Sequence, residues 1–402
     1  SSCESYENAS SPLPPPAAVA MHWQAAAYDW GQVHSWDQML QDYSSLHRRI
    51  IDGTAPQRWL LFSFSLCVGL GNYLHGLVTA LLYAMLSRRA IILDPRFWDR
   101  GLKWRHEHFD WWHKPVILGP EEANSQMLAQ NVTCVYLPLV RYLKSNGLLS
   151  HMLCQDYMSL RHQVVDLTST EYMAALLRSN LHYRPLLQRV FPAGAPNPFQ
   201  RVAVSCFKLA PEEDTVHFTL YAPKVPYVGL HVRIGVYNGF RAKVNKQQDK
   251  AFMKADCSKH PGATSVQTTK VTPVKKELKL LQRYISCVHL LLQGHYGVSP
   301  NATREEIARR APPLYLAADS QWVIDILSMK FPVQVANITE TAMLGNTANA
   351  FGDLGGHHRT LVDWLVLSRA SAFLESYGST FSSSVRSAQC NASGRRLYFL
   401  GG

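Results

Sequence analysis

The sequence predicts an α/β protein with two domains, each built around a largely parallel sheet. Three observations predict this class. The 402 residues exceed what one hydrophobic core usually serves. Apolar runs of strand length alternate with helix-period patterns in both halves of the chain. In the first domain, glycines end a strand and open a helix, which is typical of a strand–helix–strand unit.

We divide the chain into three parts. Residues 1–57 are expected to form a stem-like segment, because its beginning is rich in Ser, Pro and Ala and is typical of an extended linker. Residues 58–222 are predicted to form the first α/β domain and residues 223–402 the second. The second domain contains a basic insertion at approximately residues 236–283.

The first domain opens with a strand–helix–strand pattern. Residues 58–66 (RWLLFSFSL) predict a buried strand, which Gly69 and Gly71 end. Within residues 74–85 the apolar positions recur at helical spacing, and residues 88–94 (RRAIILD) predict a second buried strand. We expect the two strands to be parallel.

The second domain repeats this alternation. Its predicted elements are a strand at 228–235, a helix at 277–293, a strand ending at Asp319, a helix at 320–331, a strand at 332–338, a helix at 357–370, a strand at 372–376 and a helix opened by 377–389.

The formal net charge is +11, and much of the excess lies in one segment. Between Arg241 and Arg283 the chain carries eleven Lys or Arg against three acidic residues. A basic balance suits nucleic acid, a membrane surface or an anionic small ligand. No RNA- or DNA-binding motif accompanies the segment, so we expect no nucleic-acid partner. No apolar run reaches the length of a membrane span, so we expect membrane attachment only through an anchor absent from this chain.

Five N-x-S/T sequons indicate the secretory pathway, because chance would supply about two in this composition. We therefore expect a Golgi-lumenal or secreted glycoprotein. The eight cysteines suggest some disulfide bonds, whose pairing the sequence does not define. No C-x-x-C pair is present, which argues against a structural zinc site. The predicted glycosylation sites are Asn8, Asn131, Asn301, Asn337 and Asn391.

Three polar groups follow predicted strands of the second domain. His231 and Arg233 are two apart in one strand and therefore point to the same face. Asp319 and Ser320 follow a later strand, and residues 379–384 follow the last one. Parallel strands bring their carboxyl ends to one edge, where ligands of open α/β sheets bind. A guanidinium fork, a helix N-terminus and an acidic acceptor suit a nucleotide diphosphate. Each group also has a structural alternative when it is considered alone. Arg233 could form a surface ion pair, and Asp319 and the serine-rich residues 379–384 could each be a helix cap.

The glycine turn of the first domain has other interpretations. CVGLGNYLHG follows a strand as a dinucleotide fingerprint does, but Leu74 stands where the third glycine belongs, so we do not expect nicotinamide binding. It also lacks the lysine of a phosphate-binding loop, which argues against a sulfotransferase. His75 is close to the apolar stripe of the predicted helix, which favours a core or surface histidine over a functional residue. Residues 94–114 are rich in aromatic and charged side chains, which suit either a sugar ring or a packed cluster.

Three stretches together resemble a known family. VGLGNYLHGLVTALLYAMLSRRAIILD, residues 68–94, resembles the opening motif of the plant-type xyloglucan α-1,2-fucosyltransferases. VGLHVRIG, residues 228–235, resembles the H-x-R-x-G strand of the wider superfamily, which includes the α-1,6- and protein O-fucosyltransferases. HHRTLVDWLVLSRASAFLESYGSTF, residues 357–381, resembles the last motif of the plant family. The chain departs from the α-1,6 enzymes at Val236 and Tyr237, where an Asp is usual.

The resemblance implies a GT-B fold, in which two Rossmann-like α/β domains face each other across a cleft and the second binds the donor. It implies GDP-fucose as co-substrate, a glycan acceptor, and no metal or other cofactor. By position, Arg233 would hold the donor pyrophosphate, and His231 and Asp319 would lie near the nucleoside. The other implied donor-binding residues are Gly71, Asn72, Ser320, Ser379, Thr380, Phe381 and Ser382.

The implied activity is inverting transfer of fucose to a hydroxyl of a cell-wall polysaccharide or a glycoprotein glycan. Arg233 would be the catalytic group that stabilises departing GDP. Asp94 is the first candidate for a base by its strand-end position, with Asp110 and His75 after it. The alternatives are another nucleotide-sugar donor on the same fold, or an inactive glycan-binding relative. The sequence is compatible with a homodimer.

Overall fold

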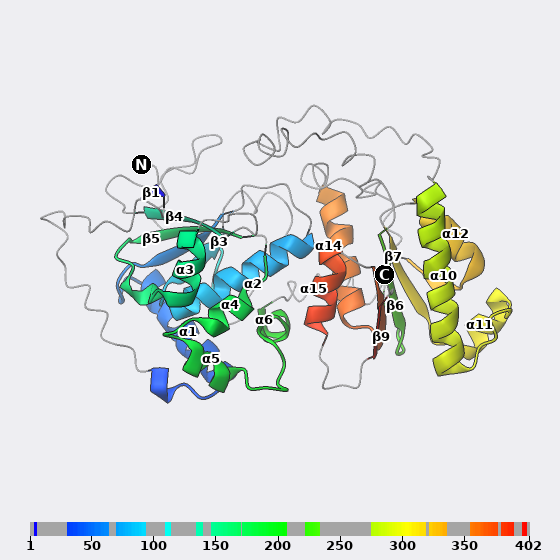
Figure 1. The fold of residues 1–402 in the computed structure, drawn as a ribbon, viewed down its shortest axis with the longest axis horizontal. Coiled ribbons are helices and arrows are strands. Elements are labelled where there is room, and N and C mark those ends of the chain that lie inside the picture. The colour runs from blue at the N-terminus through cyan, green and yellow to red at the C-terminus, as the bar shows by residue number, and fades with distance from the viewer. Residues whose placement is uncertain are drawn as a thin grey trace, which may run out of the picture. The chain divides into compact units, whose positions relative to one another are not determined.

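A computed structural model of the chain describes residues 4–5, 30–63, 70–93, 109–113, 134–139, 146–169, 171–206, 222–233, 275–318, 321–335, 354–376, 379–389 and 396–399. The chain divides into two compact units (Figure 1). The first unit comprises Ser1–Phe64, Tyr73–Asp99 and Trp104–Lys208, and the second comprises Ser65–Asn72, Arg100–Lys103 and Leu209–Gly402.

The first unit is built on a five-stranded sheet in the order β1-β4-β5-β2-β3, with every strand pair parallel. Strand β2 has the edge strand β3 on one side and the central strand β5 on the other. The topological switch point of this sheet therefore lies between β2 and β5. The strands are β1 (Glu4–Ser5), β2 (Trp59–Phe62), β3 (Ala90–Leu93), β4 (Cys134–Leu139) and β5 (Val164–Ser169).

Helix α1 (Trp36–Ile51) shows that the expected stem is wrong for these residues. The side chain of Ser35 caps the helix by accepting a hydrogen bond from the backbone of Gln38. The buried side chains of α1 recur at helical spacing, and His47 Nε2 lies 3.0 Å from the carbonyl oxygen of Ile91 in β3. The stem expectation came from the composition of the first residues, which carries no information about the amphipathic pattern that follows.

Two helices lie on opposite faces of this sheet. Ile50 of α1 belongs to one apolar cluster with Trp59 and Leu61 of β2. Helix α2 (Leu70–Leu86) lies on the other face, where a Cβ on Gly76 would come within 3.1 Å of the ring of Phe62. The remaining helices of the unit are η1 (Trp30–Gln32), α3 (Asn146–Cys154), η3 (Tyr157–Ser159), α4 (Ala174–Ser179), α5 (Arg184–Val190) and α6 (Pro198–Cys206).

The second unit contains another five-stranded parallel sheet, in the order β10-β9-β6-β7-β8. The chain runs outward from β6 through β7 to β8, then returns to the other side of β6 with β9 and β10. The switch point of this sheet therefore lies between β6 and β9. The strands are β6 (Val228–Val232), β7 (Leu314–Ala318), β8 (Val333–Gln334), β9 (Ala372–Glu375) and β10 (Arg396–Phe399).

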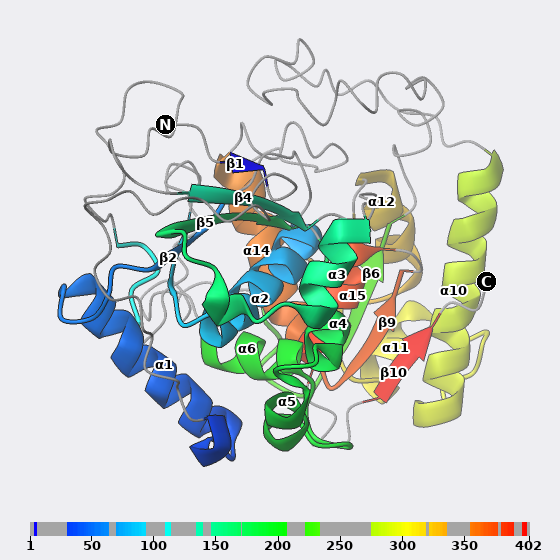
Figure 2. The same cartoon turned by 60° about the vertical axis from the view of Figure 1, so that its left-hand side comes forward.

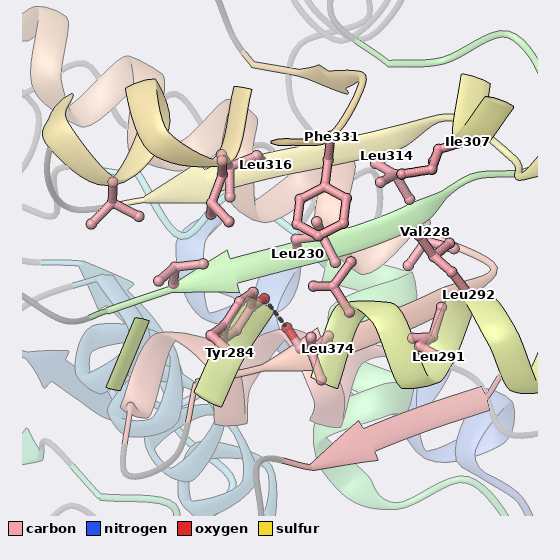
Figure 3. Close-up of a cluster of buried hydrophobic side chains, with 14 of the residues drawn as sticks. Val228, Leu230, Tyr284, Leu291, Leu292, Ile307, Leu314, Leu316, Phe331 and Leu374 are labelled. Atoms are coloured by element: carbon pink, nitrogen blue, oxygen red, sulfur yellow. Dashed lines mark hydrogen bonds between the residues drawn. The ribbon is translucent and has the colours of Figure 1, made fainter. Parts of the chain in front are cut away.

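Helices cover both faces of the second sheet (Figures 1 and 2). Helices α10 (Lys275–Tyr296) and α12 (Gln321–Lys330) pack on one face, while α14 (Leu354–Ser368) and α15 (Thr380–Ala388) pack on the other. Figure 3 shows the core beneath α10, where Tyr284 donates a hydrogen bond to the carbonyl oxygen of Leu374 at 3.2 Å. On the opposite face Gly229 lets α14 approach, since a Cβ there would lie 2.8 Å from Leu367 Cδ2. The short α11 (Arg304–Arg310) precedes β7.

The end of the expected basic insertion is helical. Residues 275–283 begin α10, whereas residues 236–274 lie outside the described residues. No helix in the described part of the chain is long and apolar enough to cross a membrane.

Candidate active site

Polar side chains gather at the switch point of the second sheet. Strand β6 ends with His231 and Val232 and is followed by Arg233, while β9 ends with Glu375 and is followed by Ser376. The parallel register pairs Leu230 with Leu374, so these two strand ends lie side by side. Helix α15 begins four residues after Ser376 and covers this edge from one face. The switch point is where ligands of open α/β sheets bind.

His231 is held beneath the first turn of α15. Its Nδ1 lies 2.5 Å from the hydroxyl oxygen of Ser382, and its ring lies 4.8 Å from the ring of Phe381, centroid to centroid. The residue is 7% exposed. Burial, reinforced by the charge of Arg233, lowers the pKa of His231 to about 3. The imidazole is therefore neutral at physiological pH.

Arg233 is anchored through its backbone. Its N–H donates to the hydroxyl oxygen of Ser376 at 2.9 Å, which fixes the point where the chain leaves β6. The residue is half-buried at the switch point. A guanidinium in this position can fork onto two oxygens of a pyrophosphate.

The N-terminus of α15 supplies a second positive end. Ser379 is the N-cap, and its side chain accepts from the backbone of Ser382 at 3.4 Å. Thr380 and Phe381 occupy the first turn and are half-buried. The unpaired N–H groups and the dipole of a helix N-terminus favour an anion, so α15 and Arg233 together form a candidate phosphate site.

A buried hydrogen-bond chain and a partly exposed ion pair fix α15 on the sheet. Trp364 of α14 donates its indole N–H to the hydroxyl of Ser384 at 3.0 Å, and that hydroxyl donates to the carbonyl of Phe381 at 2.8 Å. Arg386 pairs with Glu375 at 3.2 Å. Burial raises the pKa of Glu375, while the charge of Arg386 acts in the opposite direction. The helix N-terminus is thus held at a defined place above β9.

Gly71 lies against the start of α15 within the second unit. A Cβ on Gly71 would come 2.4 Å from both the backbone nitrogen of Phe381 and the carbonyl carbon of Thr380. No side chain fits in that space, so only glycine permits this approach. Asn72, the next residue, is half-buried. The predicted site residues Gly71, His231, Arg233, Ser379, Thr380, Phe381 and Ser382 are therefore neighbours in the second unit.

Other predicted residues fall elsewhere. Asp94, Asp319, Ser320 and the sequon residues Asn8, Asn131, Asn337 and Asn391 lie outside the described residues. Asp110 is exposed and accepts from the backbone of Trp112 at 3.0 Å, as in an Asx turn. His75 is buried in an aromatic cluster, with its ring 5.4 Å from that of Phe199. Asn301 is exposed in a turn before α11 and is accessible to a glycan.

Sequence reasoning missed a polar group at the carboxyl side of the first sheet. Ser63 follows β2 and donates to Asp166 in β5, and its oxygen lies 2.8 Å from the hydroxyl of Thr168. Asp166 is the one acidic residue in the described strands β2 to β5. A carboxylate inside a buried strand is costly, which is the sequence signal that could have identified it. Ser376 was missed for another reason: it directly follows a short, mostly apolar strand, and no local pattern marks it as a hydrogen-bond partner of Arg233.

Metal and disulfide expectations gain little evidence from the structure. Within the described residues no three His, Cys, Asp or Glu side chains lie close enough together to hold a metal ion. Cys154 and Cys287 are free thiols. The expected disulfides stay a prediction.

The fold is similar to that of solved structures. A scan against protein-family profiles and a search of curated proteins find no match. The structure is similar to that of a mutant of Arabidopsis thaliana FUT1 in complex with GDP, with a TM-score of 0.56 and 14% identity over 90% of this chain and 77% of that one. Fucosyltransferase NodZ from Bradyrhizobium gives a TM-score of 0.40 at 14% identity, covering 82% of this chain and 92% of that one. POFUT1 in complex with GDP-fucose gives 0.39 at 13%, covering 86% and 98%.

The likeness to the plant structure establishes the fold. The chain has the mixed α/β fold with parallel sheets, of GT-B type, that the sequence predicted.

Proposed function

We propose that the protein is a glycosyltransferase that moves fucose from GDP-fucose to a hydroxyl group of a glycan. The observation that carries the proposal is that Arg233 and the N-terminus of α15 are neighbours at the switch point of the second sheet, where they form the candidate phosphate site. Further support comes from the shared fold, because the plant structure of the same architecture contains GDP.

The chain's own residues act on the leaving group. The acceptor oxygen forms a bond to the anomeric carbon of fucose, and the bond from that carbon to the phosphate oxygen breaks. Its electron pair leaves with GDP, so negative charge develops on the phosphate. Arg233 and the N–H groups at the start of α15 stabilise that charge without needing to reorganise. Attack from the opposite side inverts the anomeric centre.

The first sheet supplies a candidate for the acceptor. Two substrates need two sites, and Ser63, Asp166 and Thr168 stand at the carboxyl side of β2 and β5, beside the other switch point. A carboxylate with neighbouring hydroxyls suits a hydroxyl-rich sugar better than an anion. We therefore assign Asp166 as the residue that receives a hydrogen bond, and then the proton, from the acceptor hydroxyl.

The biological setting rests on the sequence. The five sequons favour a Golgi-lumenal or secreted enzyme whose acceptor is a cell-wall polysaccharide or a glycoprotein glycan. The plant-type xyloglucan α-1,2-fucosyltransferases are the family that the motifs resemble most.

A direct test is turnover. The purified protein is incubated with GDP-fucose and a panel of plant and glycoprotein glycans in the presence of EDTA, and both GDP release and fucosylated product are measured. The proposal predicts GDP release that depends on an acceptor, persists in EDTA, and gives a product whose anomeric configuration is opposite to that of the donor. Turnover with another GDP-sugar and none with GDP-fucose would overturn the donor assignment. Glycan binding without any turnover would favour the inactive relative.

A further inference from the structure

Ser382 is buried inside the proposed donor site rather than presented to a ligand. Ser382 is 1% exposed, and its hydroxyl oxygen has two polar contacts within the protein. The backbone N–H of Ser376 donates to that oxygen at 3.0 Å, and Nδ1 of His231 lies 2.5 Å from it. Ser382 therefore links the loop after β9 to the end of β6.

The hydroxyl proton of Ser382 has one hydrogen-bond acceptor within reach among the described residues. Because the N–H of Ser376 already donates to the oxygen, the hydroxyl proton needs an acceptor of its own. Among the described residues the acceptor within reach is His231 Nδ1. If Nδ1 carried the ring proton instead, the hydroxyl of Ser382 would be left as a buried donor without an acceptor among these residues, which is costly.

We infer that Ser382 fixes the neutral tautomer of His231 in which Nδ1 accepts and Nε2 carries the proton. His231 then offers a single uncharged N–H donor to the oxygens of the bound nucleotide, and Ser382 is the positioning residue that aims it. This inference deepens the proposed donor site and rests on the proposed function for the identity of the ligand. The low pKa of His231 is consistent with a ring that stays neutral.

The packing of the ring supports a fixed orientation. The ring of Phe381 lies 4.8 Å from the imidazole, centroid to centroid. Phe381, which packs on the ring, and Ser382, which contacts Nδ1, both belong to the first turn of α15. A flip of the imidazole would break the contact between Nδ1 and Ser382.

The tautomer is measurable without any ligand. Protein labelled with ¹⁵N-histidine is studied by long-range ¹H–¹⁵N correlation spectroscopy between pH 5 and 8, with the His231 signals assigned by their loss in His231→Gln. We expect the coupling pattern of a neutral ring protonated at Nε2 throughout, and a change of that pattern in Ser382→Ala. Ser384→Ala is the matched control, because Ser384 lies in the same helix and contacts Trp364 and Phe381 rather than His231. A ring protonated at Nδ1, or a pattern unchanged in Ser382→Ala, would overturn the inference.

GDP affinity gives the second readout. The side chain of Gln places an amide N–H near the position of Nε2, whereas that of Asn places one near Nδ1. We expect His231→Gln to keep more GDP affinity than His231→Asn, and Ser382→Ala to lose about tenfold, the loss of one hydrogen bond. Equal losses in the two His231 variants would contradict the donor role. If the wild type binds no GDP while the Nε2 tautomer is observed, the proposed function fails and the tautomer assignment stands.

Discussion

Gly71 has no room for a side chain, and this makes it a sensitive residue of the site. In Gly71→Ala the new Cβ would lie 2.4 Å from backbone atoms of Thr380 and Phe381, so the first turn of α15 must shift. We expect GDP affinity, measured by calorimetry, to fall at least about tenfold. The control is Gly294→Ala in α10, where a Cβ meets no atom within 4 Å, and which should leave binding intact. Wild-type affinity in Gly71→Ala would show that the approach is not needed.

A change at Asp166 tests the proposed acceptor role independently of donor binding. In Asp166→Asn the amide keeps the shape of the side chain but cannot take a proton, so we expect transfer to fall by at least about a hundredfold, as for loss of a general base. GDP affinity should stay unchanged, because Asp166 belongs to the first unit and the phosphate site to the second. Steady-state kinetics with saturating GDP-fucose provides the measurement. Wild-type turnover in this variant would remove Asp166 from the mechanism.

At the level of single residues, sequence reasoning reached the strand-end residues and missed their supports. His231 and Arg233 could be predicted because a strand fixes which side chains share a face. Ser376 could not be predicted, because it accepts a hydrogen bond from the N–H of Arg233, a residue 143 positions earlier in the sequence. Arg89 shows the same limit. It is fully buried and donates to the carbonyl oxygens of Leu160 and His162, each at 2.8 Å, which no local pattern indicates.

Helix α15 is the element on which the site depends, and its ion pair with β9 can be tested. Arg386→Ala leaves Glu375 buried without this partner, so we expect a loss of roughly 1–3 kcal/mol in the free energy of unfolding. The lower part of this range is favoured, because Arg386 is partly exposed. Chemical denaturation measures it, and adding Glu375→Gln to the variant should restore part of the loss. A double variant less stable than the single one would contradict a stabilising pair.

Among the elements, strands β2, β3 and β6 were predictable and helix α1 was not. The buried runs at β2, β3 and β6 have strand length and are bounded by glycine or by charged residues. Helix α1 was not predicted, because the Ser-, Pro- and Ala-rich composition of the first residues does not extend to residues 36–51, where the helix lies. Its polar face and its capping serine are the local signals that would have predicted it.

The whole molecule buries several neutral histidines, and this gives its stability a pH dependence. Burial lowers the pKa of His47 and His151 to about 4 each and that of His231 to about 3. As pH falls through about 6.5 the unfolded chain takes up these protons and the folded chain does not, so stability decreases. Each histidine contributes a slope of up to about 1.4 kcal/mol per pH unit between about pH 6 and 4.

Thermal unfolding at pH 7.5, 6 and 5 measures this effect. We expect Tm to fall over the series. The fall should be smaller in His47→Gln, which removes one such proton site. A Tm that is constant or rises as the pH is lowered would contradict it.

We propose above all that the carboxyl edge of the second sheet binds the diphosphate of GDP. Calorimetric titration with GDP in the presence of EDTA, on wild type, Arg233→Ala and the exposed control Arg310→Ala, tests it most directly. We predict binding by wild type and Arg310→Ala, and a loss of about ten- to a hundredfold in Arg233→Ala, the size expected for a charged hydrogen-bond donor. Equal affinity in all three proteins, or no binding by wild type, would contradict the account.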